Sequence, residues 1–125
     1  MRRSVVEGKL LAIENFAASC EWLPPTGKDV PYDKVREAYS RALANSLATG
    51  MSLRNGEFKG QPLSRATEMF GQRRGYLFVI SRIGKLWLDC KTPGGLWPAP
   101  CPAVRVRAFH EDLKAEAERL AALLE

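Results

Sequence analysis

The segment from Gly75 to Cys90, "GYLFVISRIGKLWLDC", constrains the fold of this chain more than any other stretch. It is rich in the aromatic and β-branched residues that strands favour. Its centre, Arg82-Ile83-Gly84, fits a three-residue hairpin loop that ends in a left-handed glycine. In that register one face is apolar throughout, and the other is mixed, with Leu77, Val79 and Trp87 as its apolar part. The sequence therefore predicts a β-hairpin over residues 76–90 that needs cover on both faces.

A third strand is predicted over residues 104–109, "VRVRAF", where valines alternate with arginines as in a half-buried strand. The segment before it, "KTPGGLWPAPCPA", holds enough Pro and Gly to exclude a helix or a central strand. A final helix is predicted from about His110. Its apolar stripe is Leu113, Ala117, Leu120 and Leu124.

The first half of the chain predicts helices. Apolar residues three or four apart indicate a helix from about Val5 to Cys20, and Ser4 with Glu7 fits a capping box at its start. After a Pro-rich loop, a second helix is expected to run to about Thr49, with Asp29 as its cap and Gly50 as its stop.

Two short elements are predicted between these helices and the hairpin. Asn55-Gly56 is a strong signal for a type I′ turn, so a small hairpin is expected over residues 52–59. A brief helix is expected over residues 62–70.

Together these elements predict an α+β fold with a single domain over residues 1–125. A small, mainly antiparallel sheet (hairpin 76–90 plus strand 104–109) would pack against the N-terminal helices and a C-terminal helix. The N-terminal helices would cover the mixed face of the hairpin. The alternative is that a second copy, forming a homodimer, or a partner protein covers it.

Cysteines and hydropathy predict a cytoplasmic protein with no membrane partner. No apolar run approaches the roughly 20 residues that cross a bilayer. Arg2 and Arg3 resemble the start of a signal peptide, but Glu7, Lys9 and Glu14 interrupt the apolar region that should follow. The cysteines, at irregular spacing, are predicted to be buried free thiols: Cys20, Cys90 and Cys101.

No pattern in the chain indicates an enzyme, a metal site or a cofactor. The cysteines lack the close pairs of structural zinc sites. A dyad of Cys101 with His110, the only histidine, is conceivable, but no local signature supports it. We therefore assign no catalytic residue, no metal ligand and no cofactor from the sequence.

Charge gives the first functional hypothesis. The net charge is +5, and residues 63–110 hold eight Lys and Arg against two Asp and Glu. This block predicts binding of nucleic acid through phosphate contacts with little base readout. The residues expected to make these contacts are Arg73, Arg74, Arg82, Lys85, Arg105 and Arg107. Lys85, Arg105 and Arg107 would share a sheet face with Trp87, which conflicts with full cover of that face by helices.

The alternative function is a protein-interaction module, such as an inhibitor or adaptor, which a mobile element could encode. Interfaces favour aromatic and arginine anchors. Trp87 on the predicted hairpin and Trp97 in the Pro-rich loop are the aromatic candidates.

Overall fold

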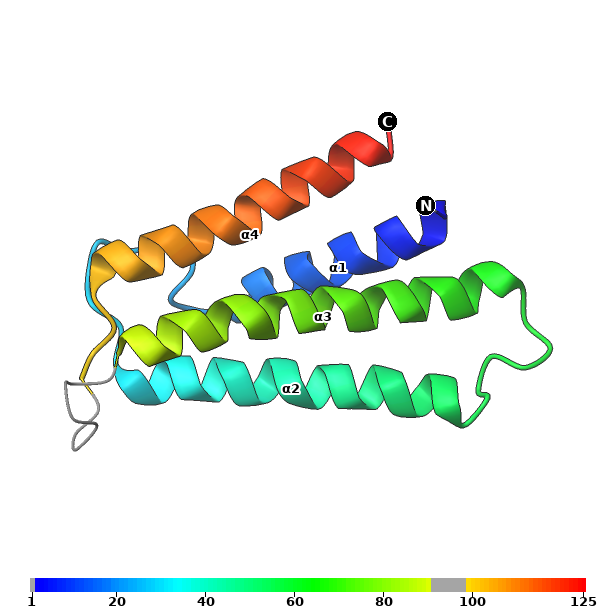
Figure 1. Cartoon of the computed structure of the whole chain (residues 1–125), viewed down its shortest axis with the longest axis horizontal. Coiled ribbons are helices and arrows are strands. Elements are labelled where there is room, and N and C mark those ends of the chain that lie inside the picture. The colour runs from blue at the N-terminus through cyan, green and yellow to red at the C-terminus, as the bar shows by residue number, and fades with distance from the viewer. Residues whose placement is uncertain (1, 91–98) are drawn as a thin grey trace.

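The computed structural model describes residues 2–90 and 99–125, and it is all-helical (Figure 1). The helices are α1 (Arg3–Ser19), α2 (Tyr32–Arg54), α3 (Leu63–Asp89) and α4 (Ala103–Leu123). The described residues contain no strand, and their one β-bridge is an isolated antiparallel pair between Val30 and Cys101. The predicted α+β fold with its antiparallel sheet is therefore wrong.

Helix α3 is the centre of the structure. It packs against all three other helices, most extensively against α1 and then α2. Helix α2 runs along one side of α3, and α1 and α4 lie toward the other side (Figure 1). Three of the four helices begin directly after a proline, namely Pro31, Pro62 and Pro102.

The predicted hairpin over residues 76–90 is part of α3. Its buried residues are Tyr76, Val79, Ile83 and Leu86, which recur every three or four residues as on one side of a helix. Gly84 lies inside the helix against the ring of Tyr39 and makes no turn. Strand propensity is a weak guide here, because packing against α1 and α2 decides the conformation.

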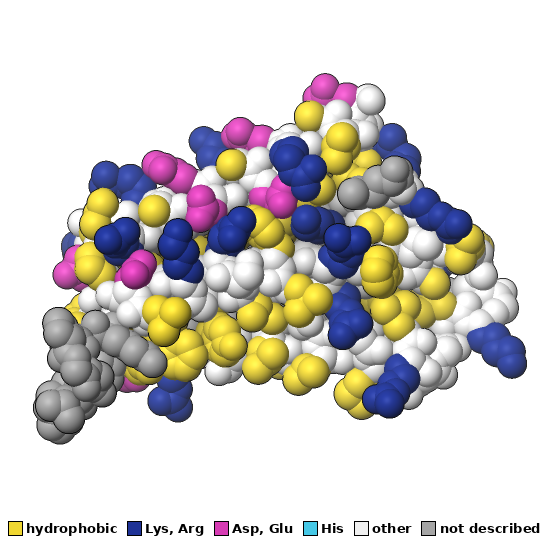
Figure 2. All heavy atoms as spheres, viewed as in Figure 1, with side chains coloured by type: hydrophobic (Ala, Val, Ile, Leu, Met, Phe, Trp, Pro, Cys, Tyr) yellow, Lys and Arg dark blue, Asp and Glu magenta, His cyan; other side chains and the backbone are white. Residues whose placement is uncertain are grey.

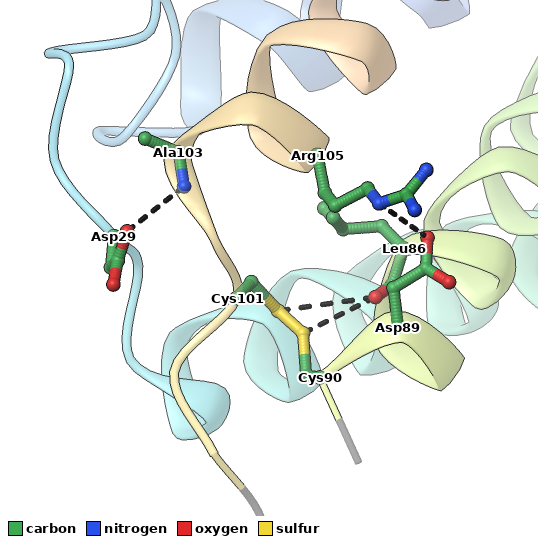
Figure 3. The surroundings of a disulfide bond; sticks show 7 residues. All are labelled: Asp29, Leu86, Asp89, Cys90, Cys101, Ala103 and Arg105. Atoms are coloured by element: carbon green, nitrogen blue, oxygen red, sulfur yellow. Dashed lines mark hydrogen bonds and ion pairs between the residues drawn. A yellow bond between two sulfur atoms is a disulfide. The ribbon is translucent and has the colours of Figure 1, made fainter. Parts of the chain in front are cut away.

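The predicted strand over residues 104–109 is the start of α4. Val106, Phe109 and Leu113 are buried at helical spacing. The alternation in "VRVRAF" was therefore too short to distinguish a strand from the first turns of a helix. Asp29, predicted to cap α2, instead accepts a hydrogen bond from the backbone N–H of Ala103 at 2.9 Å and so caps α4 (Figure 3).

The predictions for the first half are mixed. A helix forms close to residues 5–20, but Ser4 does not cap it: its Oγ hydrogen-bonds Thr67 of α3. Helix α2 continues past Gly50 to Arg54, and the brief helix at 62–70 is the first part of α3. Gly56 has the positive φ expected of it (+68°), but it lies in the connection between α2 and α3 rather than in a hairpin.

Glycines set the distance between α1 and α3. A Cβ built on Gly8, Gly71 or Gly75 would come closer than 3.0 Å to backbone atoms of the opposite helix. Any larger residue at these positions would push the two helices apart. These glycines are therefore packing residues, whereas the sequence analysis had used Gly75 as the edge of a strand.

The cysteines differ from the prediction in part. Cys90 at the end of α3 and Cys101 before α4 form a disulfide, with their Cα atoms 4.6 Å apart (Figure 3). The prediction that they are free thiols is wrong, while Cys20 is free and buried as expected. Disulfides are rare in a reducing cytoplasm, so the predicted location stays a prediction. No helix among the described residues is long and apolar enough to cross a membrane.

Candidate functional site

The six basic residues chosen from the sequence do not form one surface. Four lie on α3 and two on α4, and all six are exposed. Arg105 and Arg107, expected on one face of a strand, are two residues apart on a helix and so point about 200° apart around its axis. The shared sheet face is therefore absent. Whether these side chains bind nucleic acid stays a prediction.

Two of the five arginines among these six residues form ion pairs with acidic side chains. Arg82 Nε lies 3.9 Å from Asp112 Oδ2, and Arg105 Nε lies 3.9 Å from Asp89 Oδ2. These pairs join α3 to α4, and the second is drawn in Figure 3. Because an acidic neighbour offsets each charge, these two arginines contribute less to attracting a polyanion than the sequence analysis assumed.

Trp87 is a packing residue. Its ring lies 5.1 Å from the ring of Tyr39 and 5.8 Å from the ring of Tyr32, both on α2. Its Nε1 is buried and has no hydrogen-bond partner among the described residues. The indole is half-buried between α2 and α3, so it offers no open platform for a base. Trp97, the other predicted anchor, lies outside the described residues.

The largest group of exposed apolar side chains that the helices bring together lies on α2 and α3. These side chains expose between 39% and 61% of their surface: Leu43, Leu47 and Met51 of α2, and Phe70 and Leu77 of α3. On α2 they are four residues apart, and on α3 they are seven apart, so each set lies on one side of its helix. Figure 2 shows hydrophobic side chains along these helices with Lys and Arg among them.

Arg73 connects the two sets, because it lies one helical turn from both Phe70 and Leu77 on α3 and also reaches α2. A Cβ on Gly50 of α2 would lie 3.2 Å from Nε of Arg73 on α3. Leu47 and Met51 line the same hollow as Arg73. We call this surface the α2–α3 face, defined by its five apolar residues and by the four cations at its border: Arg36, Arg54, Arg73 and Arg74.

The border of the α2–α3 face is basic. Within the described residues, none of its four cations takes part in an ion pair, and Arg74 lies over the ring of Phe70. The acidic residues of these helices lie elsewhere: Asp33 in the first turn of α2, Glu37 beside Arg41, Glu68 in the contact with α1, and Asp89 beside Arg105. Most acidic side chains in Figure 2 gather over α4 instead.

A hollow of about 300 Å³ opens in the α2–α3 face. Its walls are the side chains of Leu47, Met51, Arg54 and Arg73, with the buried Ser46 and Gly50 beneath them. Glycine at position 50 leaves room that a side chain would fill. Two guanidinium groups and two apolar side chains therefore converge on one small opening.

The side chains whose pKa values shift lie outside the α2–α3 face. Burial raises the pKa of the Cys20 thiol to about 12, so this residue is a poor nucleophile. Burial also disfavours the charged form of Glu116, but hydrogen bonds from Arg119 and Lys9 outweigh it and hold the pKa of that carboxyl below its usual value. Glu116 accepts its bond from Lys9 at 3.3 Å, which links α4 to α1.

In the part of the chain that the structure describes, neither a Cys101–His110 dyad nor a metal site is supported. The sulfur of Cys101 is bound in the disulfide and cannot act as a thiolate with His110. In residues 2–90 and 99–125, no group of three or more His, Cys, Asp or Glu could hold a metal ion.

No family model, no curated protein and no solved structure matches this chain.

The α2–α3 face was not predicted from the sequence. Leu43, Leu47 and Met51 are four residues apart, but they lie beside the buried stripe of α2 and are exposed. The predicted break between a brief helix at 62–70 and a hairpin at 76–90 placed Phe70 and Leu77 in different elements. A continuous helix from residue 63 would have placed both on one side.

Proposed function

We propose that this chain is a protein-interaction module, of the inhibitor or adaptor kind. The α2–α3 face would bind a helical segment of a partner protein that is apolar on one side and acidic at its margins. The observation that carries the proposal is the set of five exposed apolar side chains on neighbouring sides of two helices, bordered by cations. Grooves of this type accept amphipathic helices through anchors spaced three or four residues apart.

The composition of the face favours a protein over nucleic acid. Its centre is aliphatic except for Phe70, and a phosphate backbone offers no partner for Leu43, Leu47 or Met51. The cations stand at the rim, where charge steers an acidic partner and selects against a basic one. The earlier proposal of nucleic-acid binding depends on residues of which two have acidic neighbours. We retain it as the competing outcome of the test.

The charge of the α2–α3 face also disfavours self-association through it. Two copies joined through it would bring together its four cations, which have no ion-pair partner among the described residues, and the same four cations of the other copy. Such contacts repel each other and lower affinity. A partner with acidic margins removes this cost, so a second copy is the weaker candidate for the occupant.

The test is a selection from a displayed library of helix-forming peptides of about 20 residues, with the full chain as bait. We expect enrichment of peptides with apolar residues three or four apart and with Asp or Glu beside them. A bait carrying Leu47→Asp and Leu77→Asp should enrich none of these peptides, because both substitutions place a charge in the apolar centre. Circular dichroism would verify that this variant is as helical as the parent.

Two results would overturn the proposal. One is failure to enrich any peptide whose capture depends on Leu47 and Leu77. The other is tight binding to random DNA or RNA that weakens at least roughly a hundredfold between about 50 and 200 mM salt and is lost when Arg73 and Arg74 become Gln. Binding to phosphatidylserine vesicles without peptide enrichment would count against it equally, since it would make the face a lipid contact.

A further inference from the structure

We propose that the hollow between Arg54 and Arg73 receives the carboxylate of an Asp or Glu side chain of the partner segment. This inference rests on the proposed function and specifies how the α2–α3 face selects its partner. It assigns one anchoring position to the hollow, whereas the rest of the face provides apolar contact.

The geometry of the hollow fits one side chain rather than a flat surface. Its volume is about 300 Å³, at the low end of the range for ligand sites. Leu47 and Met51 can contact the methylene groups of an inserted side chain, and Arg54 and Arg73 can reach its charged end. Because Gly50 has no side chain, the side chain of Arg73 lies directly against its backbone, and this contact positions the guanidinium group at the hollow.

The charge of the hollow requires an anion. Arg54 and Arg73 line it together, and no Asp or Glu lines it. Within the described residues neither arginine has an ion-pair partner, unlike Arg82 and Arg105. A guanidinium group matches a carboxylate through two parallel N–H···O bonds, which gives both strength and geometric selectivity. A partner carboxylate would compensate both charges at once.

Gly50 and Arg73 are coupled in a way that the test can use. A Cβ at position 50 would lie 3.2 Å from Nε, 3.5 Å from Cζ and 3.6 Å from Cδ of Arg73. Gly50→Ala would therefore displace this side chain by a few tenths of an ångström without touching a backbone atom of α3. Arg73 keeps its charge in that variant, so only its position changes.

The experiment measures affinity for the peptide selected above and for versions in which each acidic residue is replaced singly by Gln. We expect one replacement to weaken binding to the parent about tenfold. In a chain carrying Arg54→Gln and Arg73→Gln, the same replacement should weaken peptide binding by less than about twofold, because the arginines that the carboxylate contacted are gone. Gly50→Ala should give an intermediate loss. Arg36→Gln, on the same face but far along α2, serves as the matched control and should leave the tenfold loss intact.

The outcomes separate the two proposals. If Leu47→Asp abolishes binding but every Gln replacement costs the same in the parent and in the double arginine variant, the carboxylate anchor is refuted while the interaction face stands. If no selected peptide depends on Leu47 and Leu77, the proposed function itself fails. If the tenfold loss shrinks as much in Arg36→Gln as in the double arginine variant, and disappears in high salt, the effect is general charge attraction and a specific anchor is also refuted.

Discussion

Helix α3 has two sides that use apolar surface in opposite ways. On one side, Gly71 and Gly75 let the backbone of α1 approach so closely that a single added methyl group would collide with it. On the other side, Phe70 and Leu77 lie open, each one turn from Arg73, which lines a hollow with Leu47 of α2. The packing of the helices explains the first side. It does not explain the second, and an exposed apolar group of this kind indicates a binding surface.

The largest effect should come from closing the space between α1 and α3. Gly71→Ala adds only a Cβ, which normally stabilises a helix interior by up to about 1 kcal/mol. Here that Cβ would meet the backbone of Val5, so we expect a loss of about 3 kcal/mol in the free energy of unfolding. Urea denaturation followed by circular dichroism measures this change.

The matched control is the same substitution at Gly84, on the same helix. Its Cβ would lie 4.0 Å from Cε2 of Tyr39, which is ordinary contact. Gly84→Ala should therefore raise the free energy of unfolding by about 0.5 to 1 kcal/mol. If both variants lose stability alike, the glycine contact with α1 is not as close as described.

A second effect is expected at the end of α3 that joins α4. The disulfide between Cys90 and Cys101 closes a loop with a sequence separation of 11. From loop entropy, replacing both cysteines with Ala should cost roughly 2 to 3 kcal/mol. The same denaturation experiment measures it. Thiol titration of the unfolded, unreduced chain should find one reactive group, Cys20, and a count of three would contradict the disulfide.

A smaller loss of stability is expected when the pH is lowered. The pKa of Glu116 is lowered in the folded chain, so its ionised form stabilises the fold. That contribution is complete above the unfolded value of 4.5 and is lost as the pH falls through the lower folded value. We expect Lys9→Met to lower the free energy of unfolding by up to about 1 kcal/mol at pH 7. The free energy of unfolding of this variant should also depend less steeply on pH. Thermal unfolding between pH 2 and pH 7 tests it, and an unchanged slope in the variant would contradict it.

The smallest effect on stability is expected on the α2–α3 face. Leu47→Ser and Leu77→Ser remove side chains that are largely exposed, so each should change the free energy of unfolding by no more than about 0.5 kcal/mol. Ile83→Ala on the buried side of the same helix should cost about 2 to 5 kcal/mol. Equal losses at Leu77 and Ile83 would mean that Leu77 belongs to the core.

The sequence predicted the first helix and the break before α4, but it predicted neither the continuous helix α3 nor the helical start of α4. The prolines of residues 91–102 do separate two elements, and the helix near residues 5–20 is present. The segment from Tyr76 to Leu86 fits both a two-residue and a helical repeat over its length. What decides between them is the contact of Gly75 with α1, which is a property of two distant segments.

Of the residues that make up the α2–α3 face, the sequence pointed only to Arg73 and Arg74. Arg73 and Arg74 were correctly identified as exposed, and both border the α2–α3 face. Their apolar neighbours were missed because Leu77 was assigned to a covered sheet. Arg105 and Arg107 were grouped by a strand repeat, and a helix separates them. A strand repeat was predicted where the chain is helical, so residues on different sides of a helix were expected to share a surface. Each of these residues is exposed, as expected.

Methyl chemical-shift mapping with the selected peptide tests the central claim most directly. If the α2–α3 face is the binding surface, the shifted methyl groups should be those of Leu43, Leu47, Met51 and Leu77, while those of Val106 and Leu120 in the core contact of α4 stay in place. Shifts that concentrate on α4, or that spread evenly over the chain, would contradict the account.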